Sequence, residues 1–123
     1  MYKVEFAKDE NGQSETKDYI RSILVRSDKN SRIKANKIND YIKILQLKGT
    51  RAGKPFVKHI DGDIWELRPL DDRFMFAVWT GESFLILNHF VKKTQKTQKT
   101  PKREIAKAKK MLKDCIGRLK TNG

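Results

Sequence analysis

The chain has 123 residues, which is the size of one domain and is enough to bury a substantial hydrophobic core. Charged residues make up 35% of the chain, the net charge is +13, and no apolar run approaches the roughly 20 residues that a membrane-spanning helix needs, so we expect a soluble, cytoplasmic protein. The single cysteine, Cys115, excludes an internal disulfide, and with only two histidines a zinc site of the Cys/His type is not expected.

The first half of the chain is predicted to form a short strand followed by a helix hairpin. Residues 2–7 alternate between apolar and polar side chains, as in a strand. Ser14 has the side chain of an N-cap for a first helix that ends near Ser27. A second helix is predicted from about Ser31, with apolar residues at a spacing near 3.6, until Gly49 stops it.

From Phe56 onward the apolar period changes to two, which is the spacing of a strand. The segments FVKHI and DIWELRP flank a turn that contains Asp-Gly, and RFMFAVWT and SFLILNHFV flank Gly-Glu. The loop PLDD lies between these two hairpins, so the segments predict a four-stranded antiparallel sheet. With two helices inserted after the first strand, the predicted fold class is α+β, in a single domain over 1–123.

The C-terminal part is predicted to be a basic linker, 92–100, that leads into an amphipathic helix, 101–119. Thr100 can cap this helix, with Pro101 at its first position. Apolar residues at helical spacing then form one face, with lysines around the other.

Most of the net positive charge lies in this C-terminal part. Between Lys92 and Lys120, twelve Lys and Arg residues stand against Glu104 and Asp114, a net charge of +10. A polyanion is the natural partner, because each neutralised phosphate releases condensed counterions. A solvated basic tail is the simpler alternative, and a membrane-surface helix is a weaker third because large aromatics are missing from the apolar face.

The strand register predicts that Arg68 and Arg73 lie opposite each other, on the face that also carries Glu66. Two like charges held together repel, so the pair indicates either an anion that binds there or a salt-bridge ladder with Glu66. If Asp-Gly is a two-residue turn, His59 pairs with Ile64 and joins this face. The opposite face is predicted to pack on the helix hairpin through Trp65, Leu67, Phe74, Phe76 and Val78. His89 is predicted to have a structural role, facing the core with Leu85 and Leu87.

The segments DIWELRPLDDRFMFAVW and FLILNHFVKKTQKTQKTPKREIAKAKK resemble the phage-derived Gp49-like branch of HigB toxins, within the RelE/ParE superfamily of bacterial toxin–antitoxin systems. The resemblance extends over nearly the whole chain and implies a RelE-like fold, with an N-terminal strand, a helix hairpin, an antiparallel sheet and a basic C-terminal helix. It also implies a toxin that enters the ribosomal decoding site and cleaves messenger RNA. The implied partner is a HigA-like helix-turn-helix antitoxin, and operator DNA would be reached only through it.

RNA can be cut without a metal or other cofactor when its own 2′-hydroxyl attacks the adjacent phosphate. The enzyme then aligns the 2′-oxygen, stabilises charge on the phosphoryl oxygens and protonates the leaving 5′-oxygen. Arg68 and Arg73 are the candidates for charge stabilisation, and Arg73 matches the arginine that follows the hairpin turn in the family. Glu66 is a candidate proton acceptor and His59 a candidate donor, although Glu66 could instead only pair with arginine and His59 could be an ordinary strand residue.

Lysines are expected to grip the RNA backbone. Lys92 and Lys93 match the basic pair that closes the last strand in the family. The other RNA-binding candidates are Lys54, Lys58, Lys96 and Lys99. The tail lacks the aromatic platform of a typical single-strand binder, and it lacks the tyrosine or histidine cluster of some superfamily members. The general acid therefore stays open between His59, a lysine and the ribosome.

Two other functions remain compatible with the sequence. One is a ParE-like inhibitor of DNA gyrase that does not cleave RNA, because the same scaffold serves both activities. The other is a non-catalytic, basic nucleic-acid-binding module. The paired arginines with flanking lysines favour the nuclease.

Overall fold

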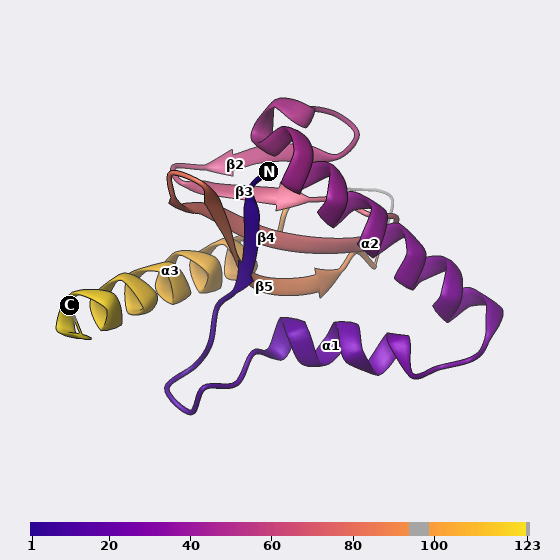
Figure 1. Cartoon of the computed structure of the whole chain (residues 1–123), viewed down its shortest axis with the longest axis horizontal. Coiled ribbons are helices and arrows are strands. Elements are labelled where there is room, and N and C mark those ends of the chain that lie inside the picture. Colours follow the sequence, from indigo (N-terminus) through magenta and orange to yellow (C-terminus); the bar gives the residue numbers. More distant parts are fainter. Residues whose placement is uncertain (94–98, 123) are drawn as a thin grey trace.

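A five-stranded mixed sheet forms the middle of the molecule (Figure 1). The computed structural model describes the backbone of residues 1–93 and 99–122 and the side chains of residues 1–93 and 99–119. The strands are β1 (Lys3–Phe6), β2 (Val57–Asp61), β3 (Ile64–Leu67), β4 (Asp72–Thr80) and β5 (Ser83–Val91). The helices are α1 (Glu15–Leu24), α2 (Lys29–Lys48), the short 3₁₀ helix η1 (Gly49–Ala52) and α3 (Lys102–Asn122).

The helices cover the two faces of the sheet unequally. In Figure 1, α1 and α2 lie in front of the sheet and α3 lies behind it. The hairpin-side core joins α1 and α2 to buried side chains that include Leu67, Phe74 and Phe76. The α3-side core joins Ala108 to a second set that includes Met75 and Leu87. Both faces of the sheet are therefore covered, and the α+β class predicted from the sequence is confirmed.

Side-chain caps set the starts of the first two helices. The Ser14 hydroxyl accepts a hydrogen bond from the Lys17 amide, as predicted for an N-cap. The second helix begins at Lys29, before the predicted start, because the Asp28 carboxylate caps it by accepting from the Ser31 amide. The first helix also ends earlier than predicted, at Leu24.

Gly49 ends α2 with a positive φ of +62°, a backbone conformation that favours glycine. A Cβ atom at this position would lie 3.1 Å from the Tyr2 ring and 3.2 Å from the Phe84 ring. Glycine is therefore required both by the backbone turn and by the close approach of two aromatic side chains.

The strand order is β1-β5-β4-β3-β2. The four strands from β2 to β5 form the predicted antiparallel meander. The first strand adds a fifth member, because β1 pairs with β5 in parallel, with Val4 opposite Phe84. The sequence pattern identified this strand but did not specify its partner.

A β-bulge in β2 changes the predicted facing of His59. In β2, His59 pairs with Trp65 and Asp61 pairs with Ile64, so Ile60 is an extra residue in the ladder. The predicted pairing of His59 with Ile64 is therefore wrong, and His59 lies on the hairpin-side face, where its ring contacts Trp65 at a centroid distance of 5.0 Å.

In β5, Met75 pairs with Asn88 and Phe76 pairs with Ile86, so Leu87 is the extra residue. Leu87 consequently faces the α3-side core with Leu85, whereas His89 turns to the opposite face. His89 pairs with Phe74 and faces the hairpin-side core, as predicted. Leu85 and Leu87 were predicted to share that face and do not, because the bulge interrupts the alternation between them and His89.

The C-terminal helix begins at Lys102, where the Pro101 carbonyl accepts from the Glu104 and Ile105 amides. The Thr100 hydroxyl does not cap this helix as predicted. Instead, it donates a hydrogen bond to the Glu66 carboxylate, 2.8 Å away. The reason is positional: Thr100 lies where the chain returns to the sheet, and a buried carboxylate is within its reach.

Apolar side chains on the N-terminal half of α3 pack on the sheet, with Ala108 completely buried. The apolar face continues beyond the sheet, where Leu119 is 58% exposed. Val78, which was predicted to be in the core, is also exposed because it lies near the end of its strand.

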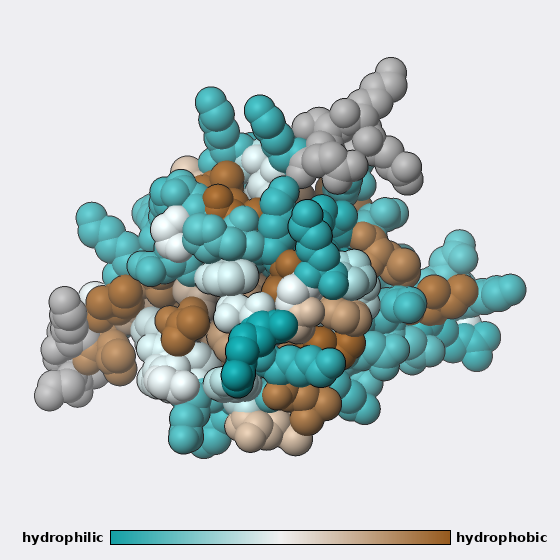
Figure 2. Space-filling view, turned by 90° about the horizontal axis from the view of Figure 1, so that it is seen from above, coloured by the Kyte–Doolittle hydropathy of each residue, from teal (hydrophilic) through white to brown (hydrophobic). Residues whose placement is uncertain are grey.

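Hydrophilic residues cover most of the surface visible in Figure 2, and hydrophobic residues appear there in small separate groups. None of the helices in the described part of the chain combines the length and apolar character needed to cross a lipid bilayer.

Candidate functional site

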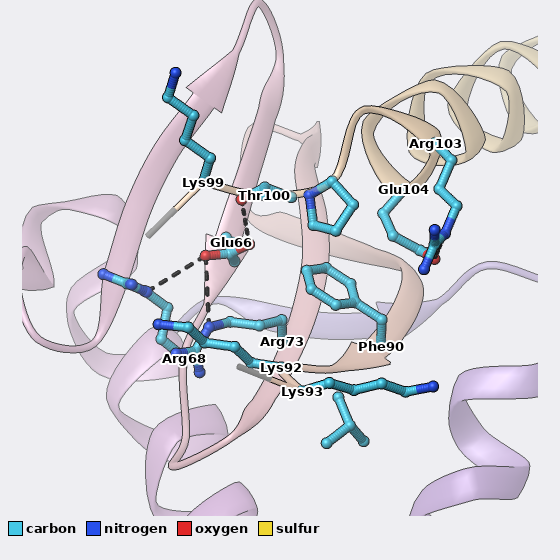
Figure 3. Close-up of a pocket in the computed structure, with 12 residues that line it drawn as sticks. Glu66, Arg68, Arg73, Phe90, Lys92, Lys93, Lys99, Thr100, Arg103 and Glu104 are labelled. Atoms are coloured by element: carbon cyan, nitrogen blue, oxygen red, sulfur yellow. Dashed lines mark hydrogen bonds and ion pairs between the residues drawn. The ribbon is translucent and has the colours of Figure 1, made fainter. Parts of the chain in front are cut away.

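A cavity of about 370 Å³ opens on the α3 side of the sheet, where the start of α3 meets the ends of β3, β4 and β5. Figure 3 shows its lining side chains, which come from these strands and from the segment that precedes and begins α3. The lining residues are Glu66, Arg68, Arg73, Phe90, Val91, Lys92, Lys93, Lys99, Thr100, Pro101, Arg103 and Glu104.

The antiparallel register aligns the central residues of the cavity. Leu67 pairs with Phe74, and continuing this register by one residue places Arg68 opposite Arg73, as predicted. On the other side of β4, Arg73 pairs with Phe90. Arg68, Arg73 and Phe90 thus form one row across three neighbouring segments, on the face that α3 covers.

Glu66 lies beside this row and is only 2% exposed. Its Oε1 atom is 3.3 Å from Arg68 Nε and 3.8 Å from Arg73 Nε, while its Oε2 atom accepts the hydrogen bond from Thr100 (Figure 3). One buried carboxylate therefore partly balances two guanidinium groups, as in the salt-bridge alternative considered from the sequence.

Backbone carbonyls hold the Arg73 guanidinium in place. Its NH1 group donates to the Leu70 carbonyl at 2.6 Å and to the Asp72 carbonyl at 2.9 Å. Leu70 has a φ of +54°, an unusual backbone conformation for a residue with a branched side chain. Burial and repulsion by Arg68 lower the pKa of Arg73, against the opposing effect of Glu66. The group stays charged, because arginine is not deprotonated in proteins.

A second polar cluster supports the site from the hairpin side of the sheet. The fully buried Asp72 carboxylate accepts from the Tyr19 hydroxyl at 2.6 Å and contacts His89 Nε2 at 2.8 Å, both through Oδ1. The Tyr19 ring stacks on His89, and Lys34 Nζ lies 3.5 Å from the same carboxylate oxygen. This cluster ties both helices of the hairpin to the residue that precedes Arg73.

The cluster also explains two shifted pKa values. Burial acts to raise the pKa of Asp72, but the hydrogen bonds from His89 and Tyr19 and the charge of Lys34 outweigh it and lower this pKa. Burial and the Asp72 hydrogen bond raise the pKa of Tyr19. Tyr19 therefore remains a hydrogen-bond donor at any physiological pH.

The lining of the cavity is strongly basic. Six Lys and Arg side chains line it against two glutamates, and one of these, Glu104, accepts from Asn88 Nδ2 at 3.1 Å and pairs with Arg103. Lys92, Lys93 and Lys99, three of the predicted RNA-binding lysines, are among the six. Lys96 lies outside the described residues. The arrangement suits a ligand with several negative charges.

The remaining predicted site residues lie away from the cavity. His59 is on the opposite face of the sheet, and its Nε2 atom is 2.8 Å from the Gly62 carbonyl oxygen. Lys58 is opposite Glu66 in the ladder but does not line the cavity, and Lys54 is exposed in the segment between η1 and β2. The structure therefore brings together Arg68, Arg73 and Glu66 but separates them from His59.

Thr100 and Phe90 are among the cavity residues that were missed as site residues in the sequence. Thr100 was interpreted only as a helix cap, and Phe90 was not considered as a ligand-binding side chain. The register alone could have found Phe90, because residues paired with Arg73 on its second side share its face.

Chemically, the site offers fixed guanidinium donors, several ammonium groups and one buried carboxylate in a single cavity. Such a set can bind a phosphodiester, stabilise added charge on its oxygens and exchange a proton. Among the described residues, no three His, Cys, Asp or Glu side chains are grouped so that they could hold a metal ion.

A comparison with protein families shows which family the chain resembles. The model described as "Phage derived protein Gp49-like" matches residues 26–113 of the chain, a range that contains every residue lining the cavity. A search of curated proteins gives no match.

Proposed function

The chain belongs to the phage-derived Gp49-like family, part of the RelE/toxin–antitoxin-like group, and on that premise we propose that it is a HigB-like toxin that cleaves messenger RNA on the ribosome. The family is consistent with the toxin of a toxin–antitoxin pair, which implies an antitoxin partner. In our proposal that partner is a HigA-like helix-turn-helix protein. The observation that supports the nuclease most directly is the pair of facing arginines with a buried carboxylate in a basic cavity.

The arginines would bind the scissile phosphate. Arg73 is already oriented by two carbonyl acceptors, so its remaining donors need little reorganisation to meet phosphoryl oxygens. Arg68 would supply a second planar donor group from the opposite strand. Guanidinium groups stabilise the charge that develops on these oxygens when the 2′-hydroxyl attacks, and they do so without a metal.

Glu66 would accept the proton of the attacking 2′-hydroxyl. In the structure both of its oxygens have partners: the two arginines at Oε1 and Thr100 at Oε2. A phosphate that takes over the arginine donors would leave Oε1 without its cations and open to a hydroxyl proton. Substrate binding itself would thereby make the carboxylate a competent base.

The leaving 5′-oxygen would take its proton from Lys92 or Lys93, because both line the same cavity and His59 does not. The remaining lysines would grip the neighbouring backbone phosphates. The ribosome would supply the aligned message, in keeping with a site that has few groups for reading base edges.

A primer-extension map of cellular messenger RNA after induction of the protein tests this proposal. Ribosome-dependent cleavage predicts new 5′-ends inside translated codons, in frame, and their loss when the message is made untranslatable. Growth inhibition without such cuts, together with inhibited DNA supercoiling, would instead identify a ParE-like gyrase inhibitor.

A further inference from the structure

Phe90 is the aromatic side chain that lines the cavity, and its position in the sheet is set by the register. It pairs with Arg73 across β4 and β5, and Arg73 in turn faces Arg68. Directly opposite residues in an antiparallel pair have Cβ atoms roughly 4.5–5.5 Å apart. An aromatic ring is therefore held one strand away from the phosphate-binding arginines, on the same face.

The start of α3 covers the row of residues next to Arg68, Arg73 and Phe90, and leaves these three at the cavity. Glu66, Met75 and Asn88 form the neighbouring row, in which Thr100 bonds to Glu66 and Asn88 donates to Glu104. The Phe90 ring is only partly buried and lines the open space with Val91 and Pro101. In Figure 3 it lies between the Glu66–Arg73 group and the Arg103–Glu104 pair.

The combination of a phosphate clamp and an apolar aromatic wall fits one class of ligand. In a nucleotide, the phosphate and the base are attached to the same sugar, so a group that binds the phosphate brings the base within reach of a neighbouring wall. Bases stack on aromatic side chains whatever their identity, because every base presents a π-face. A simple polyanion without bases would gain nothing from an aromatic ring beside the arginines.

We propose that Phe90 is the base-stacking platform of a nucleotide subsite, in which Arg68 and Arg73 hold the phosphate and Phe90 holds the adjoining base. The base-stacking platform deepens the proposed function, and it rests on that function only for the assumption that the bound polyanion is a nucleic acid. The platform gives affinity without base selectivity, so one subsite can accept any message that the ribosome presents.

Binding of adenosine 5′-monophosphate and of ribose 5-phosphate to the purified full chain tests the platform, because the two ligands share sugar and phosphate and differ only in the base. We expect the nucleotide to bind about tenfold tighter or more. In Phe90→Leu, which keeps an apolar side chain, the nucleotide should fall to the affinity of the sugar phosphate, which itself should not change. Phe90→Tyr should restore the preference.

Two control variants separate stacking from general effects. Phe56→Leu changes an aromatic residue that packs against Tyr41 on the other side of the sheet, and it should keep the preference. Arg73→Ala should weaken both ligands equally. Retention of the preference in Phe90→Leu, equal binding of both ligands to the wild type, or no binding of either at millimolar concentration would overturn the platform. Parallel loss of both ligands in Phe90→Leu would also overturn it, because the ring would then only maintain the shape of the cavity.

These measurements require no ribosome and no cleavage. If the message carries no in-frame cuts while the nucleotide preference depends on Phe90, the nuclease proposal fails and the platform stands. If the message carries in-frame cuts while the nucleotide preference does not depend on Phe90, the platform fails and the nuclease proposal stands.

Discussion

At the scale of single residues, the site is a balance between like charges and one carboxylate. Arg68 and Arg73 repel each other, and the repulsion together with burial lowers the pKa of Arg73. Glu66, together with Asp71 and Asp72, offsets these effects on Arg73 only in part. An incoming phosphate would complete the neutralisation, which is the physical reason for placing the substrate here.

Replacing either arginine by alanine should abolish growth inhibition while the chain stays folded and bound to its antitoxin. Loss of one such donor costs on the order of 10²–10³ in rate, or about 2.7–4 kcal/mol of transition-state stabilisation. The measurement is the single-turnover cleavage rate of ribosome-bound message for Arg73→Ala and Arg68→Ala. Arg32→Ala, an exposed position on α2, is the matched control and should cleave normally. Full toxicity of both cavity variants at equal expression would show that the site is elsewhere.

The Asp72 carboxylate makes the free energy of unfolding depend on pH in the acidic range. Its pKa is lower in the folded chain than in the unfolded one, so its contribution is present above the unfolded value of about 3.9 and is lost as pH falls through the folded value. Asp72→Asn should therefore lower the free energy of unfolding by about 1–3 kcal/mol at pH 7, and the difference from wild type should shrink toward pH 3.

Urea denaturation across this pH range measures the effect. Asp40→Asn, at an exposed position of α2, should change the free energy of unfolding little at any pH. A difference between Asp72→Asn and wild type that stayed constant down to pH 2 would mean that the carboxylate charge has no part in stability.

At the scale of elements, the end of β5 and the start of α3 bring most of the cavity's lysines together. Lys92 and Lys93 follow β5 directly, and the Lys92 amide is held by the Asp71 carbonyl at 2.8 Å. The basic linker predicted from the sequence thus starts at a fixed point beside the arginines.

Removing charge at this point should reduce the salt dependence of RNA binding. The slope of log affinity against log salt should flatten by about 0.7 for each lost phosphate contact in the double variant Lys92→Gln/Lys93→Gln. The same charge change on the opposite side of the sheet, Lys37→Gln/Lys43→Gln, provides the control and should leave the slope unaltered. The measurement is a titration with a short single-stranded RNA at several salt concentrations. Equal slopes in the wild type and both double variants would mean that Lys92 and Lys93 have only a structural role.

The packing of α3 on the sheet can be tested with two alanines of the same helix. Ala108 is completely buried against the sheet, whereas Ala106 is exposed. Enlarging Ala108 to leucine should overpack the contact and lower the free energy of unfolding by about 1–3 kcal/mol, while Ala106→Leu should be nearly neutral. Denaturant unfolding of both variants gives the comparison. Equal stability of the two would mean that α3 does not pack on the sheet as described.

At the scale of the whole molecule, the parts that follow from regular periodicity were predictable and the irregular parts were not. Alternation and turn residues gave the meander and the opposition of Arg68 and Arg73, because a regular register depends only on counting. The predicted facing of His59, and that of Leu85 and Leu87, failed because a β-bulge inserts one residue and reverses the parity beyond it. The two register shifts between β4 and β5 cancel before His89, which faces the hairpin-side core as predicted. Side-chain periodicity gives no sign of where such an insertion falls.

Contacts between distant segments were also beyond the sequence pattern. Thr100 has the composition of a helix cap, and only the packing of α3 on the sheet brings its hydroxyl to Glu66. The Asp72 cluster likewise unites Tyr19, Lys34 and His89 from three elements. Local propensity contains no information on which buried polar groups will meet. The strand register, by contrast, correctly placed Arg68 opposite Arg73.

The pairing of β1 with β5 imposes an order on biosynthesis. The first strand of the chain has to wait for the last, because residues 3–6 find their neighbours only when residues 83–86 have been made. The cavity is completed later still, since Thr100 and α3 follow all five strands. A nascent chain that is shorter than this holds its arginines in an unfinished sheet with no wall from α3. In the proposed role, the nuclease site would be complete only after the last quarter of the message has been translated. An antitoxin already present in the cell would then bind a toxin that becomes active only when its chain is released.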